Sequence, residues 1–452
     1  MAYHISENID KNKIFIVNRS EIEGRLEPYY YRPSISLLEK KVRSLTTKRL
    51  KNYAISIAGG ATPNKTEAEK YYSDDKSGIP FLRVQNLQTT GELSLDGCLY
   101  INKETHNGLL RRSQVSEGDL LIKITGVGRM AIASVAPKDF IGNTNQHMVV
   151  VKTGNTDISK YLAQYLNLDI IEKIASRHST GGTRPALDYS SLKNLPIIEN
   201  LNFSAIEDAI EIKKEKDRKA KDLLKTIDEY LFEKLGVTIP KIDKNLRNRI
   251  FFSSLKKIES NRIDPTYSLC LDKIVSSTKY KNIYLRSIAH IVKGNALSSS
   301  EVENGDIPVI AGGQTSPYKH NRSNYEGNVI TVSASGAYAG YVWYHDYPIY
   351  ATDCSVIFSK DESIFLTKYL FEVLKFQQDA IYRLQTGAAQ PHVYPADLQM
   401  LNIPFIPIDK QDEIVKHIKN IRDEAKSLQK EGNDNLNKAK KIVENMIMDM
   451  YK

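Results

Sequence analysis

The clearest pattern along the chain is a heptad spacing of apolar residues in a long segment before Gly236. A capping box of Ser204 and Glu207 predicts the start of a helix, and Gly236 followed by Pro240 predicts its end at about Leu235. Its apolar steps of four and three, around a polar centre, favour a coiled coil over an ordinary amphipathic helix on a globular core. The predicted seam is Ile206, Ile210, Ala220, Leu224, Ile227 and Leu231.

A second heptad segment runs from about Lys410 to the end of the sequence. The spacing across Gly432 adds a residue to the heptad rhythm, so we expect a break or a phase shift there. Since one heptad helix cannot bury its own seam, the two segments are predicted to pair as an antiparallel coiled coil, a rod with a globular domain at each end. The second predicted seam is Ile414, Ile418, Ile421, Ala425, Leu428, Leu436, Ala439, Val443, Met446 and Met450.

The segments before the two helices carry the same short motifs in the same order. Each copy has short β-branched runs between Gly, Asn, Asp and Pro clusters, and a helical stretch near 158–177 or 363–383. No single match is specific, but the shared order indicates a duplicated domain. The matched motifs are Arg25–Pro28 with Arg262–Pro265, Glu117–Leu121 with Glu326–Ile330, Gly126–Gly128 with Gly336–Gly340, Thr180–Gly181 with Thr386–Gly387, and Leu192–Pro196 with Leu398–Pro404.

The repeat and the helices together predict an α+β fold with two repeated globular domains and two long helices that form an antiparallel coiled coil. A length of 452 residues accommodates two to four folding units at roughly 150 residues each. The predicted boundaries are 1–202 for the first domain, 203–240 for the central helix, 241–408 for the second domain and 409–452 for the C-terminal helix.

Composition places this protein outside several classes. Hydrophobic residues at 41% and charged residues at 26% allow real cores, so the chain is neither disordered nor collagenous. No apolar run approaches the ~18 residues of a membrane-spanning helix and the N-terminus has no signal-peptide core, so we expect a cytoplasmic protein with no membrane partner. The net charge of +9 fits a nucleic-acid partner without requiring one.

The sequence carries no convincing catalytic or metal-binding motif. There is no GxxxxGK[ST] phosphate loop, no HExxH, no histidine cluster at metal spacing and no amino-methyltransferase signature, and the three cysteines are far apart. Gly126–Gly128 is weak as a nucleotide motif because no GxGxxG follows. We therefore predict no catalytic residue, metal or cofactor in this chain, and favour a binding or specificity component over an enzyme.

Loops of both copies are rich in residue types that contact DNA. Arg, Asn and Gln can bond base edges, Lys and backbone amides can bind phosphates, and glycines let a backbone approach a duplex closely. Each side chain taken alone is more often a solvated loop residue, but the matched loops favour a shared DNA-binding surface. The candidates in the first copy are Gly59, Gly60, Arg83, Gln85, Asn86, Lys123, Arg129, Asn143, Asn145, Gln146, Arg177, His178, Gly182, Thr183 and Arg184. Those in the second copy are Gly294, Gln314, Lys319, His320, Asn321, Arg322, Arg383, Gln385, Gln390 and His392.

Three stretches give the chain a resemblance to the specificity subunit of Type I restriction-modification systems. They are Glu117–Gln146, Thr180–Ile197 and Thr386–Ile414, and the repeat and both helices extend the resemblance over nearly the whole chain. The chain differs from the family pattern at the start of the first helix. The family has a Pro-x-x-x-Gln sequence there, and this chain has Asn200–Ile206 instead.

The resemblance implies two target recognition domains, each binding half of a split sequence in double-stranded DNA, and helices that set the spacing and dock two methyltransferase (modification) subunits. It implies S-adenosylmethionine on those subunits, and ATP and Mg²⁺ on restriction/translocase subunits where a system has them. Two other interpretations stay open. One is a coiled-coil scaffold that binds proteins through its globular ends, and the other is a stand-alone DNA-modifying enzyme with unrecognised motifs.

Overall fold

The structure, a computed structural model, describes residues 9–73, 78–238, 276–387 and 390–451. The chain divides into two compact units: unit 1 is Met1–Lys216 with Lys430–Lys452, and unit 2 is Asp217–Gln429. Each unit therefore takes one part of each long helix, α7 (Ser204–Leu235) and α13 (Ile408–Asp449). The predicted domain boundaries, drawn at the helix ends, stay a prediction. Pro240 and the Arg262–Pro265 motif lie outside the described residues.

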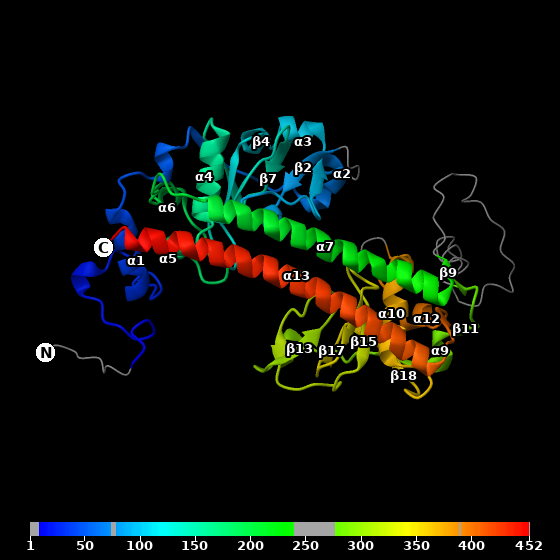
Figure 1. Ribbon diagram of the computed structural model, residues 1–452. Coiled ribbons are helices and arrows are strands. Elements are labelled where there is room, and N and C mark those ends of the chain that lie inside the picture. Colours follow the sequence, from blue (N-terminus) through cyan, green and yellow to red (C-terminus); the bar gives the residue numbers. More distant parts are fainter. Residues whose placement is uncertain (1–8, 74–77, 239–275, 388–389, 452) are drawn as a thin grey trace. The chain divides into compact units, whose positions relative to one another are not determined.

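Two sheets form the body of unit 1 (Figure 1). The first is antiparallel with the order β1-β8-β5-β6, and the second has the order β3-β2-β7-β4, in which β2 and β7 are parallel. The strands are β1 (Ser56–Gly59), β2 (Ile79–Leu82), β3 (Leu99–Ile101), β4 (Gln114–Ser116), β5 (Leu120–Lys123), β6 (Ala133–Val135), β7 (Ile141–Thr144) and β8 (Met148–Lys152). The helices are α1 (Pro33–Ser44), α2 (Ala68–Tyr71), α3 (Lys103–Asn107), α4 (Thr156–Leu166), α5 (Asp169–His178) and α6 (Tyr189–Lys193). Because residues 145–147 alone separate β7 from β8, this loop joins the two sheets.

The central strands of the first sheet are buried on both faces because successive side chains of a strand point in opposite directions. Leu120 and Ile122 of β5 lie in one core with α4 and α5, whereas Leu121 lies in a second core with Leu82 of β2 and Val115 of β4. Strand β8 alternates between the same two cores. This explains why both strands are nearly continuous apolar runs in the sequence.

Unit 2 repeats this arrangement. Its first sheet is antiparallel with the order β12-β18-β15-β16, and a smaller sheet has the order β14-β13-β17, in which β13 and β17 are parallel. The strands are β9 (Val237–Thr238), β10 (Ser276–Ser277), β11 (Asn282–Tyr284), β12 (Ala289–Lys293), β13 (Ile307–Ile310), β14 (Lys319–His320), β15 (Val329–Ser333), β16 (Val342–His345), β17 (Tyr350–Ala351), β18 (Cys354–Ser359) and β19 (Asn402–Pro404). The helices are α9 (Leu285–Ile288), α10 (Thr367–Phe376), α11 (Gln378–Tyr382) and α12 (Pro395–Leu398). The shared strand order confirms the predicted α+β fold with a repeated domain.

The helical stretch that the sequence predicts inside each domain is broken into two helices. In unit 1, α4 ends before Asn167, whose side-chain Nδ2 donates to the Ala133 carbonyl (2.7 Å) and whose Oδ1 accepts from the Ala133 amide (3.2 Å). In unit 2, α10 ends before Gln377, and the Oε1 of Gln378 accepts from the Val342 amide (2.9 Å). In both units a side-chain amide bonds the backbone of the edge strand, β6 or β16, which would otherwise lack a partner there.

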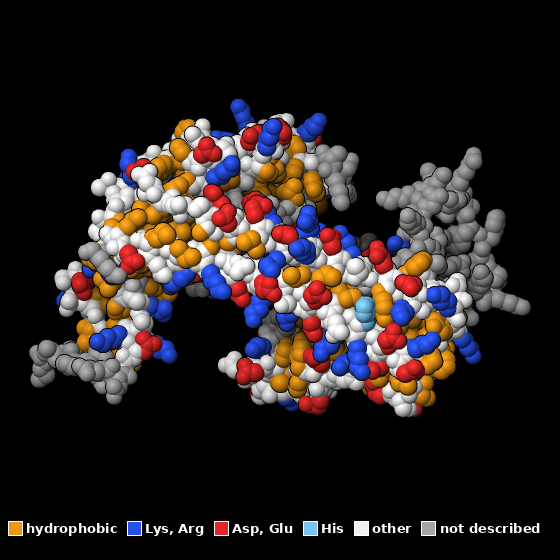
Figure 2. All heavy atoms as spheres, in the orientation of Figure 1, with side chains coloured by type: hydrophobic (Ala, Val, Ile, Leu, Met, Phe, Trp, Pro, Cys, Tyr) orange, Lys and Arg blue, Asp and Glu red, His pale blue; other side chains and the backbone are white. Residues whose placement is uncertain are grey.

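Within each unit, α7 and α13 run side by side in opposite directions (Figure 1). In unit 1, Lys216 Nζ donates to Glu431 Oε2 (2.6 Å). In unit 2, the rings of Tyr230 and His417 lie 4.1 Å apart, in the same register. The outward faces that Figure 2 shows carry interspersed acidic and basic side chains, as expected for helices that bury one apolar stripe. The predicted antiparallel pairing of the two helices is confirmed.

Most of the predicted seam is buried, with three exceptions. The buried positions are Ile206, Ile210, Ala220, Ile227, Leu231, Ile414, Ile418, Ile421, Ala425, Leu436, Ala439 and Val443, and Leu428 is half-buried. The prediction was wrong for Leu224 (39% exposed), Met446 (48%) and Met450 (54%). Leu223 packs on the unit 2 core instead of Leu224, and the fully buried Ile447 replaces Met446. Beyond Leu428 the buried positions recur every 11 residues. This spacing is close to the natural period of an α-helix, so the buried positions stay on one face without the supercoiling that a strict heptad requires.

Helix α13 continues through Gly432, so the expected phase shift occurs without a break. Gly432 is buried, and a Cβ atom placed on it would lie 3.2 Å from the Cα of Lys213 on α7. The backbones of the two helices therefore approach closely at this point of unit 1, and the glycine permits that approach.

We expect Gly432→Leu to destabilise unit 1 by roughly 1–3 kcal/mol, because the side chain would meet the α7 backbone and force the helices apart. Urea unfolding followed by hydrogen exchange in unit 1 measures the change. Asn433→Leu at the exposed next position is the matched control. Equal stability of the two variants would show that close helix approach at Gly432 is not a constraint.

Candidate nucleic-acid interface

Two loops of unit 1 that carry repeat motifs are hydrogen-bonded to one another. The Gly126 amide, in the glycine-rich loop after β5, donates to the Pro185 carbonyl (3.0 Å). In the turn after α5, Thr180 and Ala186 exchange two backbone hydrogen bonds of 2.9 and 2.8 Å, and Gly181 has a φ of +99°, which favours glycine. We call residues 124–128, 144–147 and 180–186 loop cluster 1.

Unit 2 contains the same network. The Gly336 amide donates to the Pro391 carbonyl (3.0 Å), Thr386 and His392 exchange two backbone hydrogen bonds of 2.8 Å, and Gly387 has a φ of +94°. We call residues 333–340, 351–353, 386–387 and 390–392 loop cluster 2. The matched motifs of the sequence therefore meet at the same place in each unit.

A glycine after the first strand of each sheet fixes the third loop of each cluster. A Cβ atom on Gly60 would lie 2.1 Å from the Thr144 carbonyl oxygen, and one on Gly294 would lie 2.2 Å from the Thr352 carbonyl oxygen. Gly59 is similar, since a Cβ atom there would overlap the Tyr189 hydroxyl. Packing inside each domain thus accounts for these three glycines, which sequence reasoning assigned to close approach of a duplex.

The exposed side chains of the clusters differ between the two units. The predicted DNA contacts that are exposed in or beside the clusters are Gln146, Gly182, Thr183 and Arg184 in unit 1 and Gln314 and Gln390 in unit 2. Sequence reasoning missed three tyrosines there: Tyr189 (40% exposed), Tyr338 (47%) and Tyr394 (53%). Tyr338 lies two residues from Gly336 and from Gly340, whereas Tyr189 and Tyr394 each follow the glycine of a Thr-Gly turn region by seven residues, and this position relative to the glycines was the available signal. The half-buried His392 lies against Tyr394, with ring centroids 5.8 Å apart.

Five predicted DNA contacts lie in the interior of the domains: Asn86, Lys123, Asn143, Asn145 and His320. Lys123 Nζ donates to the Val127 carbonyl (2.7 Å), which holds the glycine-rich loop, and burial lowers the pKa of this amine. Asn143 Nδ2 donates to the Leu110 carbonyl (2.8 Å), and His320 Nδ1 accepts from a backbone amide. We therefore correct their assignment from base or phosphate contacts to groups that position loops.

Arg177 and His178 at the end of α5 are joined to a buried carboxylate. Glu39 of α1 is 3% exposed and accepts from Arg177 Nη1 (2.5 Å), His178 Nε2 (2.8 Å) and Arg43 Nε (2.7 Å). Burial alone would raise the pKa of Glu39, but these hydrogen bonds and charges outweigh it and hold the pKa at about 2. Both predicted DNA contacts are thus bound to α1.

The remaining candidates lie outside the two clusters or bond within their own unit. Arg83 donates to Gly97, Arg129 pairs with Asp169 and donates to Asn167, Asn321 donates to Glu303, and Gln385 donates to Ala339. Arg322 Nε lies 3.3 Å from His320 Nε2. Gln85 is exposed after β2, Lys319 is exposed and lies 3.6 Å from Asp306, and Arg383 is half-buried after α11.

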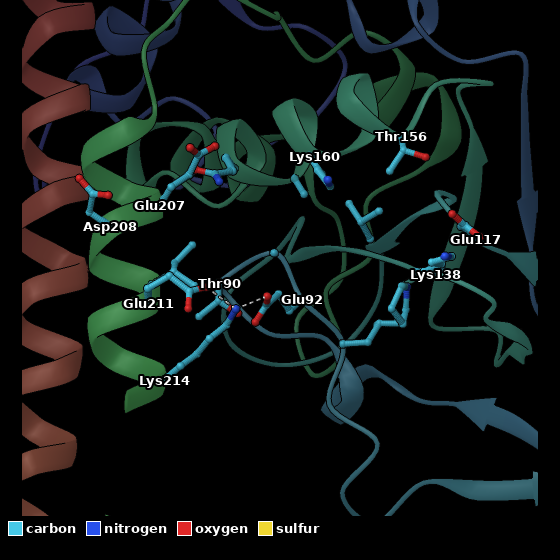
Figure 3. A pocket seen from close by; sticks show the side chains of 18 residues that line it. Thr90, Glu92, Glu117, Lys138, Thr156, Lys160, Glu207, Asp208, Glu211 and Lys214 are labelled. Atoms are coloured by element: carbon cyan, nitrogen blue, oxygen red, sulfur yellow. Dashed lines mark hydrogen bonds and ion pairs between the residues drawn. The ribbon is translucent and has the colours of Figure 1, made fainter. Parts of the chain in front are cut away.

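The first turns of α7 border a cavity of about 680 Å³ in unit 1 (Figure 3). Lys214 of α7 reaches across to Glu92 (2.6 Å) and also pairs with Glu211 (2.8 Å), and these hydrogen bonds and charges outweigh burial and raise the pKa of Lys214. The other polar groups of the wall belong to Lys, Asp, Glu, Thr and Gln residues. The arrangement ties α7 to the loop that contains Glu92.

The described part of the chain contains neither a cluster of metal-binding side chains nor a membrane-spanning helix. No group of three or more His, Cys, Asp or Glu side chains there could hold a metal ion. No helix there is long and apolar enough to cross a membrane.

The family described as the Type I restriction modification DNA specificity domain matches the sequence twice, over residues 45–198 and 278–438. The chain belongs to this family. The two matches cover both copies of the repeat and include both loop clusters, so the predicted family is confirmed.

Several solved structures resemble the chain. The S subunit of the Type I restriction-modification system from M. genitalium is 17% identical with a TM-score of 0.38, over 87% of this chain and 95% of that one. The HsdS subunit from Thermoanaerobacter tengcongensis is 14% identical with a TM-score of 0.34, over 89% and 95%. A structure that concerns assembly and conformational transition of the type I R-M system is 14% identical with a TM-score of 0.41, over 90% and 97%. No curated protein matches the sequence.

Proposed function

We propose that this chain is the non-catalytic specificity subunit of a Type I restriction-modification complex, and that each domain reads one half of a bipartite DNA target. The observation that carries the proposal is the double match to a DNA specificity domain family, with one match over each copy. Loop clusters 1 and 2 share their backbone hydrogen bonds but expose different side chains, which suits two half-sites of different sequence.

The exposed groups of the clusters are of the kinds that read base edges. Arg184 in cluster 1 can bond guanine through two donors, and Gln146 in cluster 1 and Gln390 in cluster 2 can bond adenine in the same bidentate way. The hydrogen bonds within each cluster hold the backbone of these side chains in place before DNA binds, which lowers the entropic cost of recognition.

The two helices are proposed to act as the spacer between the half-sites and to dock two methyltransferase subunits. In this proposal S-adenosylmethionine binds to those subunits, and ATP and Mg²⁺ bind to restriction/translocase subunits where the system has them. The chain itself then needs no cofactor.

A domain exchange tests the proposed division of labour. We expect that replacing residues of roughly 20–200 with the corresponding domain of another family member changes one half of the methylated sequence and leaves the other half unchanged. Sequencing of methylated DNA from cells that express the chain with its methyltransferase partner gives the result. The reciprocal exchange in unit 2 is the control and should change the other half. Methylation without sequence preference, or a change in both halves, would contradict the proposal.

A matched insertion tests the spacer. In unit 2, Tyr230 faces His417 and Lys234 Nζ donates to Glu413 Oε1 (3.1 Å), which fixes the register of the two helices. Seven residues inserted before Leu223 in α7 and before Ala425 in α13 preserve that register. At about 1.5 Å per residue they add roughly 10 Å, so we expect the gap to lengthen by at most about three base pairs, with both halves unchanged.

The same methylation assay reads the outcome of the insertion. Insertion into α7 alone is the control, because it shifts the two seams out of register and should abolish activity. If the matched insertion altered the bases recognised while the gap stayed constant, the spacer role would be wrong.

The scaffold and enzyme alternatives predict different results. A protein-binding scaffold would bind DNA weakly and with little salt dependence, whereas phosphate contacts give a steep fall in affinity with salt. A stand-alone enzyme would modify DNA without a partner when given Mg²⁺ or S-adenosylmethionine.

A further inference from the structure

Helices α1, α5 and α13 border a second cavity in unit 1, of about 450 Å³, away from the residues of loop cluster 1. Four basic residues line it: Arg32 and Lys41 from the α1 segment, Lys173 from α5 and Lys441 from α13. Among the described residues, no aspartate or glutamate is part of the lining. The cavity is therefore lined by charges of one sign.

Aromatic rings hold two of these cations without neutralising them. The Arg32 guanidinium lies 4.9 Å from the centroid of the Tyr29 ring, and Lys41 Nζ lies 5.0 Å from the centroid of the Tyr451 ring. A cation over a ring keeps its full charge, and the contact orients it. Both side chains are only partly exposed, so their position is set by the fold.

Lys441 has one acidic neighbour, and that carboxylate has another role. Lys441 Nζ lies 3.4 Å from Glu444 Oε2, but Glu444 Oε1 accepts hydrogen bonds from the backbone amides of Asp169 (2.5 Å) and Ile170 (3.1 Å). Glu444 is 2% exposed and caps the start of α5. Asp169 also interacts electrostatically with Lys173, so two carboxylates act on four cations and the surroundings of the cavity keep a net positive charge.

Like charges around a partly enclosed space repel one another more strongly than they do in open solvent. An anion bound inside the space attracts all of them and offsets this repulsion. We propose that this cavity binds a phosphate group, supplied either by a nucleic-acid backbone or by a free phosphate compound. A doubly charged phosphate matches several converging cations, and the fork of donors on Arg32 fits its oxygens. Asn12 and Ser34 add neutral hydrogen-bonding groups to the wall. The inference rests on these residues and does not depend on the proposed function.

Titration of the full-length chain with inorganic pyrophosphate at low salt, followed by calorimetry, tests the site. We expect binding to the wild-type chain, and binding at least roughly tenfold weaker to the Arg32→Ala/Lys173→Ala variant, because each cation contributes a charge-assisted contact. The matched control is Lys48→Ala/Lys51→Ala, which removes two exposed charges of unit 1 that do not line the cavity. Unchanged melting temperatures establish that both variants are folded.

A second titration, with duplex DNA, identifies the source of the phosphate. If the Arg32/Lys173 variant also binds DNA more weakly and with a salt slope smaller by about two, the ligand is the nucleic-acid backbone. If DNA binding is unchanged while pyrophosphate binding falls, the ligand is a free phosphate compound. The site is refuted if pyrophosphate does not bind the wild-type chain, or if it binds the wild type, the variant and the control equally.

Discussion

A chain that ends at residue 429 is expected to lose the fold of unit 1 while unit 2 keeps its own. Residues 430–452 belong to unit 1, where Leu436, Val443 and Ile447 are 0–3% exposed in the main core. Burying three such side chains contributes about 5–9 kcal/mol, which is comparable with the whole stability of a typical domain.

The truncation also removes two polar contacts with the body of unit 1. Lys440 Nζ donates to the Thr89 carbonyl (2.8 Å), and Glu444 caps the first amides of α5. Their loss leaves buried backbone groups without partners and adds to the cost. Both effects fall on unit 1, because unit 2 takes only the part of α13 that precedes residue 430.

Hydrogen exchange by mass spectrometry separates the two units. We expect rapid exchange in β5, β8 and α5 of the truncated chain and native protection in β15, β18 and α10. A chain that ends at residue 449 is the control, because Met450 and Tyr451 are exposed. Native protection of β5 and β8 in the chain that ends at residue 429 would show that the unit 1 core stands without α13.

Glu39→Gln is expected to destabilise unit 1 by about 3 kcal/mol at neutral pH, because it leaves the guanidinium groups of Arg177 and Arg43 around a buried site without their carboxylate. Urea unfolding of unit 1 gives the value. The control is Glu92→Gln, which breaks the exposed pair with Lys214 and should cost less than about 1 kcal/mol. A similar cost for both variants would show that burial does not strengthen the Glu39 cluster.

We also expect the effect of Glu39→Gln on stability to depend on pH. The pKa of Glu39 is about 2 in the folded protein against an ordinary value of 4.5, so the folded state holds fewer protons on this group between these values. The stability that Glu39 contributes is therefore fully present above pH 4.5 and disappears as the pH falls through about 2. We expect the difference between the wild type and Glu39→Gln to shrink over that window.

The fold was largely predictable, because repeat order and apolar spacing are direct consequences of layered packing. The start and end of α7 follow its sequence signals, and Gly236 has the positive φ of +59° that favours glycine. The errors at Leu224 and Met446 arose because a strict heptad was extended along helices whose buried positions drift from it. That drift depends on the partner helix, so one helix sequence does not show it.

The candidate interface was less predictable than the fold. On residue type alone, Asn86, Asn143 and Arg184 were all predicted to contact DNA. The two asparagines are fully buried and hydrogen-bonded, whereas Arg184 is exposed. A polar side chain in a loop forms its hydrogen bonds either with water or with the protein backbone. Which of the two occurs depends on partners distant in the sequence, such as the Leu110 carbonyl that accepts from Asn143.

The division of α13 between the units also has a consequence for synthesis on the ribosome. Most of unit 1 is made first, yet part of its core comes from the last residues of the chain. At about 5–20 residues per second, the groove that receives Leu436, Val443 and Ile447 stays open for roughly 10–50 s while the rest of the chain is translated. During that interval the nascent chain lacks residues 430–452, as the truncated protein described above does. Synthesis of residues 430–452 is therefore the step that completes the first domain.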